Sequence, residues 1–181
     1  HLLPALPAMD ALTNARASGL IIDPQKGQVL AFVGETTLIG ESGQMAAGKI
    51  GSSLSPFVYL TGFTRGLSPA SLLWDIPNET GIQNYDGQFH GPMRLRTALA
   101  NDYRLPMEGV LAQMGTENVK RISQSFGVDY ENDLIFPLNL AQAYGVFSAD
   151  GVMNGQMLGG NLQAVTVLEI RDAAGEIWLD W

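Results

Sequence analysis

The sequence predicts an α+β fold in which a helical region lies between two β-hairpins. Residues 18–34 hold two apolar runs around a Pro/Gly turn, which is typical of a hairpin. Apolar residues recur at helical spacing through much of 52–150. Residues 164–181 alternate apolar and polar positions on either side of Asp172-Ala-Ala-Gly175, which predicts a second hairpin. We therefore expect a single domain over 1–181, with 1–17 as a lead-in segment.

The composition supports a folded domain and excludes several partners. Hydrophobic residues make up 46% of the 181 residues, enough to bury a core. Eighteen acidic residues against ten basic ones give a net charge of −8, with no basic stripe for a nucleic acid. No apolar run approaches the roughly 20 residues that cross a bilayer. We expect any membrane anchor to lie outside this chain, which has the character of a piece of a longer protein.

Metal and cofactor sites are not expected. The chain has no cysteine, which excludes disulfides and thiolate ligands and leaves the redox compartment open. Its two histidines, His1 and His90, are too few and too far apart for a metal site, and His90 is interpreted as a loop residue. No phosphate-binding or dinucleotide fingerprint occurs, so we predict no cofactor.

Each element follows from local patterns along the chain. Residues 19–23 and 28–33 form the strands of the first hairpin, and 8–17 form a short helix before it. Residues 34–51 are a glycine-containing loop, and 67–91 are a long excursion with a helical piece near 69–73. The further predicted helices, each with an apolar face, are 92–101, 105–114, 116–126 and 137–149.

The segment that begins at Gly51 has the strongest chemical character. It opens an apolar helix, from Ser52 to about Thr64, with a hydroxyl directly after a glycine. Pro56 falls in the first turn, where a missing backbone donor costs least, and Gly66 ends the helix. A serine in this position is also typical of a helix cap, so capping is the alternative role for Ser52.

The same segment, Gly-Ser-Ser-Leu-Ser-Pro-Phe, resembles the Gly-Ser-x-x-Lys-Pro-Phe signature of penicillin-binding protein transpeptidase domains, especially class A bifunctional ones. The phrase at 19–34 is similar to that family's opening hairpin, and the resemblance spans about residues 17–181. It implies a serine β-lactamase/transpeptidase-like fold, here incomplete. The other phrases that resemble the family are, in chain order, 67–71, 75–77, 84–86, 91–101, 105–106, 114–115, 126–128 and 137–147.

The family's catalytic motifs are altered in this chain. The resemblance places Ser52 at the nucleophile position and Ser55 where the family has its lysine base. Asp102 and Arg104 stand where the family has Ser-x-Asn, and they are expected to pair with each other or with Asp86. A hydroxyl cannot replace an amine base, whose assistance is worth about two to four orders of magnitude in rate, or about 3–5 kcal/mol.

The third motif, Lys-Thr-Gly, has no counterpart in this sequence. We expect the resemblance to be truncated before the point where the family has this motif. Lys49, three residues before Ser52, is a conceivable displaced base but fits better as a solvated loop lysine. The sequence therefore predicts a transpeptidase-like domain without catalysis.

Three functions remain open on this basis. The leading one is a catalytically silent domain of peptidoglycan synthesis, outside the cytoplasmic membrane, that binds a stem peptide or a partner. The second is an active D,D-transpeptidase, reactive with β-lactams, that is acylated at Ser52 with a base from elsewhere and with the rest of its site in a C-terminal part outside this chain. The third is a structural spacer for a linked glycosyltransferase. Because the family's first strand pairs with a strand from the far C-terminus, we expect an open edge near Leu20–Asp23 that takes a second copy or another polypeptide.

Overall fold

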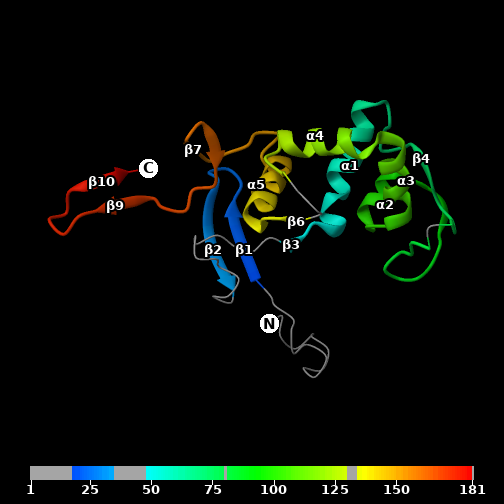
Figure 1. Ribbon diagram of the computed structural model, residues 1–181, viewed down its shortest axis with the longest axis horizontal. Helices are drawn as coiled ribbons and strands as arrows, with labels where there is room; N and C mark the ends of the chain where they lie inside the picture. Colours follow the sequence, from blue (N-terminus) through cyan, green and yellow to red (C-terminus); the bar gives the residue numbers. More distant parts are fainter. Residues whose placement is uncertain (1–17, 35–47, 80, 130–133, 181) are drawn as a thin grey trace, which may run out of the picture. The chain divides into compact units, whose positions relative to one another are not determined.

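The structure is a computed structural model that describes residues 18–34, 48–79, 81–129 and 134–180 (Figure 1). Its helices and two-stranded sheets confirm the predicted α+β class. The chain divides into two compact units, one from 1–46 with 144–181 and one from 47–143. The predicted helix at 8–17 and most of the predicted loop at 34–51 lie outside the described residues. None of the helices in the described ranges has the length and apolar character of a membrane span.

The first unit contains the predicted N-terminal hairpin. Strands β1 (Ser18–Asp23) and β2 (Gln28–Gly34) pair antiparallel, with a bulge between Ile21 and Ile22. The turn needs a glycine at position 27, because its φ is +69° and a Cβ there would lie 2.4 Å from a backbone oxygen of Asn154. Among the described strands β1 pairs only with β2. Capture of a second polypeptide on its other edge stays a prediction.

The C-terminal part of this unit holds two short hairpins instead of one. The predicted hairpin is present in shorter form as β9 (Glu169–Arg171) and β10 (Ile177–Asp180). A further hairpin, β7 (Gln156–Leu158) with β8 (Asn161–Gln163), was not predicted. The expected strand start at 164–165 is instead buried backbone beside β2, where Val165 exchanges hydrogen bonds of 2.7 and 2.9 Å with Gly27 and Val29.

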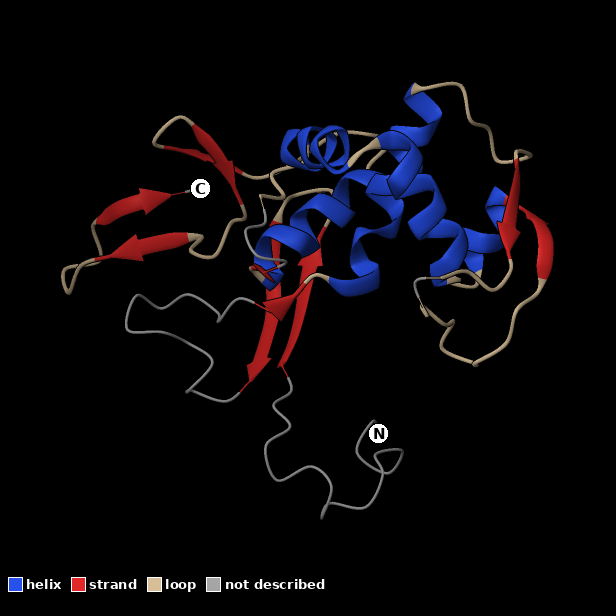
Figure 2. Ribbon diagram, turned by 45° about the vertical axis from the view of Figure 1, so that its right-hand side comes forward, coloured by secondary structure: helices blue, strands red, loops and turns tan. Residues whose placement is uncertain are grey.

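The second unit is built around α1 (Ser55–Thr64), whose Phe57 and Val58 are fully buried. Helices α2 (Leu95–Ala100), α3 (Arg104–Met114) and α4 (Thr116–Ser125) all contact it, and they are blue in Figure 2. The ring of Phe57 meets the edge of Phe126 at 5.5 Å between centroids. Gly66, at φ +96°, ends α1 as predicted. The last helix of the chain is α5 (Pro137–Ser148).

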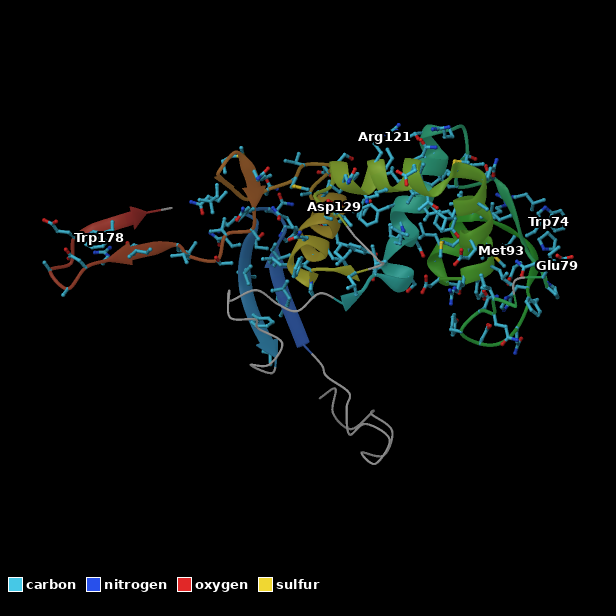
Figure 3. All side chains as sticks on the ribbon, in the orientation of Figure 1. Trp74, Glu79, Met93, Arg121, Asp129 and Trp178 are labelled. Carbon is cyan, nitrogen blue, oxygen red and sulfur yellow. The ribbon has the colours of Figure 1, made fainter. Side chains whose placement is uncertain are left out.

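Two short sheets in the second unit correct the predicted elements. Strand β4 (Leu72–Asp75) replaces the helical piece expected near 69–73, and it pairs with β5 (Gly91–Arg94), so the helix expected from residue 92 begins only at Leu95. Side chains alternate across this hairpin: Met93 is 9% exposed and Trp74 is 58% exposed (both labelled in Figure 3). Lys49 belongs to a strand and not to a loop, since β3 (Gly48–Lys49) pairs with β6 (Leu134–Ile135).

Candidate functional site

Ser52 lies in a single 3-10 turn, η4 (Gly51–Leu54), that leads directly into α1. Gly51 permits this entry because its φ is +49°, a value that side chains disfavour. Neither η4 nor α1 has a side-chain cap, so the alternative role of Ser52 as a helix cap is wrong. The Ser52 side chain is exposed, and within the described part of the chain it has no hydrogen-bond partner. The hydroxyl of Ser52 is therefore accessible to solvent.

The structure brings the altered positions of the first two motifs together. Ser55 is 3% exposed, and its Oγ donates a hydrogen bond of 3.3 Å to Oδ1 of Asp102, 47 residues later. Asp102 connects α2 to α3 with φ +51°, a region that aspartate tolerates better than most residues. The hydroxyl at the position where a lysine was expected is therefore paired with the carboxylate at the position where a serine was expected.

The guanidinium of Arg104 is paired with Glu108 on the same helix. Its side chain is 60% exposed, and its Nε lies 3.5 Å from Oε1 of Glu108, one turn along α3. Among the described residues Arg104 forms no ion pair with Asp102 or with Asp86, so the pairing expected from the sequence is wrong. The exposed ion pair between Arg104 and Glu108 contributes little to stability. Arg104 does not neutralise the carboxylate at position 102.

Tyr59 lies one helical turn after Ser55, on the same side of α1. Its ring is 1% exposed, and its hydroxyl has no hydrogen-bond partner among the described residues. Burial, and then the negative charge of Asp102, raise the pKa of Tyr59 well above its ordinary value. This face of α1 thus presents hydroxyls and one acidic neighbour, a set without the basic group that serine activation needs.

Replacing Tyr59 with phenylalanine is expected to leave the chain as stable as before or to stabilise it by up to about 1 kcal/mol. The change keeps the buried ring and removes a hydroxyl that is desolvated without a partner. Urea unfolding followed by tryptophan fluorescence measures the difference. A loss of more than about 1 kcal/mol would show that the hydroxyl is hydrogen-bonded after all.

A buried polar cluster adjoins the second motif. The carboxylate of Asp75 is fully buried and accepts bonds from Asn84 Nδ2 (2.8 and 2.9 Å) and from the backbone N and Nδ1 of His90 (2.9 and 2.7 Å). Burial alone raises the pKa of Asp75. The hydrogen bonds and the charge of His90 outweigh it, so the pKa lies below its ordinary value of 3.8.

His90 is more than the simple loop residue expected from the sequence. Its Nε2 lies 3.2 Å from Oδ2 of Asp86, and its ring stacks on Tyr103 at 4.2 Å. Tyr103 stands between the two altered positions of the second motif. The pairing of β4 with β5 brings His90 to Asp75, since Asp75 lies opposite Gly91, the residue after His90. The sequence carried no signal for this contact. No group of three or more potential metal ligands occurs among the described side chains.

The free energy of unfolding is expected to depend on pH through Asp75. A carboxyl whose pKa is lowered in the folded state stabilises the fold fully above its unfolded pKa, and that contribution is lost as the pH falls through the folded value. We therefore expect stability to decline below about pH 4, and to decline less steeply in Asp75→Asn. Urea unfolding at a series of pH values measures this, and equal slopes in both proteins would contradict it.

The sequence is similar to that of curated penicillin-binding proteins. It is 27% identical to penicillin-binding protein 1A of Escherichia coli (strain K12) over 156 residues, which cover 73% of this chain and 18% of that protein. The chain thus spans less than a fifth of that relative. No family model matches it.

The fold is also similar to that of solved penicillin-binding proteins. The structure of penicillin-binding protein 1A from Haemophilus influenzae superimposes with a TM-score of 0.71 at 24% identity, over 92% of this chain and 27% of that one. PonA1 from Mycobacterium tuberculosis, in complex with penicillin V, superimposes with a TM-score of 0.73 at 16% identity, over 95% of this chain and 52% of that one. Similarity in sequence and in fold together support a transpeptidase-like region of the penicillin-binding protein type in this chain.

Proposed function

We propose that this chain is a penicillin-binding-protein-like transpeptidase domain of peptidoglycan synthesis that does not transfer acyl groups and acts by binding. One observation carries the proposal: the buried hydroxyl of Ser55 is bonded to the carboxylate of Asp102, where the family has a lysine and a serine. Its ligand is a peptidoglycan stem peptide or a partner protein. Its place is outside the cytoplasmic membrane, in the cell envelope, as part of a protein that is membrane-anchored elsewhere.

The charge of the site argues against acylation. Relative to the family's motifs, position 55 lacks an amine and position 102 gains a carboxylate, while the charge of Arg104 is paired with Glu108. The negative charge of Asp102 therefore lies beside Ser55 without an ion-pair partner among the described residues. A penicillin carries a carboxylate, which this field repels. The hydroxyl of Ser55 also has its proton directed at Asp102 and has no basic lone pair to offer Ser52.

The hydrogen bond between Ser55 and Asp102 also favours a site that still binds a ligand over a site that has lost its structure. A buried hydroxyl without a partner costs free energy, and here the two replacements supply partners to each other. The exposed hydroxyl of Ser52 and the exposed carboxylate of Asp102 leave a polar surface at the start of α1. Such a surface offers hydrogen bonds to a peptide without cleaving it.

A titration with a fluorescent muropeptide that carries a complete stem peptide tests this proposal. We expect reversible binding that is weakened about two- to fivefold in Ser52→Ala, which loses one hydrogen bond, and in Asp102→Asn, since an exposed charge contributes up to about 1 kcal/mol. Glu117→Gln on α4 is the matched control, because it removes an exposed acid elsewhere in the same unit.

The alternatives are other outcomes of the same titration. The exposure of Ser52 favours the second candidate, an active D,D-transpeptidase acylated at that residue, and a covalent muropeptide adduct would support it. No binding in any of the proteins would leave the third candidate, a spacer module.

A further inference from the structure

We propose that Asn84 is a positioning residue that fixes the backbone of 102–104 at the second motif. It belongs to the long excursion after α1, twenty residues before Arg104. The residue is 4% exposed, and both the nitrogen and the oxygen of its side-chain amide form hydrogen bonds. Nothing in the family's three motifs assigns it this role, and it does not contact Ser52 or Ser55 among the described interactions.

The oxygen of Asn84 completes the start of α3. The first four N–H groups of a helix have no partner inside it. In α3 the N–H of the N-cap, Tyr103, bonds to a carbonyl of α2 at 3.0 Å. The next two, of Arg104 and Leu105, lie 2.9 and 3.4 Å from Oδ1 of Asn84, and the fourth position is Pro106, which has no N–H. Oδ1 of Asn84 therefore caps α3 from another part of the chain, in place of the N-cap residue Tyr103, which forms no side-chain capping bond.

The nitrogen of Asn84 is held as firmly as its oxygen. Nδ2 donates to both oxygens of Asp75 and to the backbone oxygen of Gln88 at 2.8 Å. Asp75 is itself fixed on β4 and bound by His90. With the donor end occupied by a carboxylate, the amide can present only its oxygen to α3.

The capping of α3 by Asn84 affects the orientation of Asp102. Asp102 has a strained φ of +51° immediately before the capped turn, so its carboxylate keeps its direction toward Ser55 only if the following residues are held. Asn84 holds them from a different part of the chain. The meaning of this role for ligand binding rests on the proposed function, but the positioning itself does not.

Amide hydrogen exchange measured by NMR on the ligand-free chain tests the inference. In Asn84→Ala the amides of Arg104 and Leu105 are expected to exchange about tenfold faster relative to that of Val110, in the core of the same helix. Gln83→Ala, an exposed amide in the same loop, is expected to leave the ratio unchanged. A ratio that changes less than about twofold in Asn84→Ala would overturn the proposal.

A second pair of variants covers the case in which Asn84→Ala does not fold. Asn84→Asp keeps the acceptor but places two carboxylates together, and adding Asp75→Asn restores one amide and one carboxylate. We expect protection of the Arg104 amide to be lost in Asn84→Asp and regained in the double variant. Failure of the double variant to regain it would overturn the proposal. Because no ligand is present, failure of muropeptide binding in the unchanged chain is a separate result.

Discussion

The double variant Ser55→Lys, Asp102→Ser is expected to react with a fluorescent penicillin about two to four orders of magnitude faster than the unchanged chain. The two changes return an amine one turn after Ser52 and remove the carboxylate that now occupies its surroundings. An amine beside a serine hydroxyl can be neutral and accept the proton of Ser52. The rate of covalent labelling, followed by intact mass, measures the effect.

The single variant Ser55→Lys is the informative control. With Asp102 still in place the new amine forms an ion pair and stays protonated, since a carboxylate beside an amine raises the amine's pKa. We expect it to label no faster than the unchanged chain. Adding Ser52→Ala to the double variant is expected to abolish labelling. Equal rates for the single and double variants would mean that Asp102 plays no part in the silence of the site.

Replacing Asp75 with alanine is expected to lower the free energy of unfolding by about 2–4 kcal/mol. The change removes the buried carboxylate that accepts hydrogen bonds from the Asn84 amide and from the backbone N–H of His90, and leaves the Asn84 amide only the backbone oxygen of Gln88. Chemical unfolding in urea at neutral pH measures the loss.

Asp86→Ala is the matched control for this prediction. Asp86 also contacts His90, but its side chain is 26% exposed, so its loss is expected to cost less than about 1 kcal/mol. Similar losses in the two variants would show that the burial of Asp75 does not determine its contribution.

The parts of the fold that depend on local periodicity could be predicted from the sequence. The hairpin of β1 and β2, the helical character of the segment after Ser52, and helices α3, α4 and α5 each follow from apolar spacing within one element. The Gly159-Gly160 pair between β7 and β8 was also a usable hairpin signal, because two glycines supply the positive φ values of a tight turn.

Strand β4 was misassigned because its inward positions are Leu73 and Asp75, and a buried acid does not fit an apolar alternation. That acid is tolerated only because Asn84 and His90, 9 and 15 residues later, provide its hydrogen bonds. The Ser55–Asp102 bond spans 47 residues and has no local signal either. Both features of the site depend on tertiary contacts that spacing along the chain does not encode.

We propose that no basic group activates the hydroxyl of Ser52. This proposal is tested by the intact mass of the unchanged chain after prolonged incubation with an excess of a penicillin, followed by peptide mapping. We expect a single species at the mass of the unmodified protein. A species heavier by one penicillin, with the addition on the peptide that carries Ser52, would contradict it.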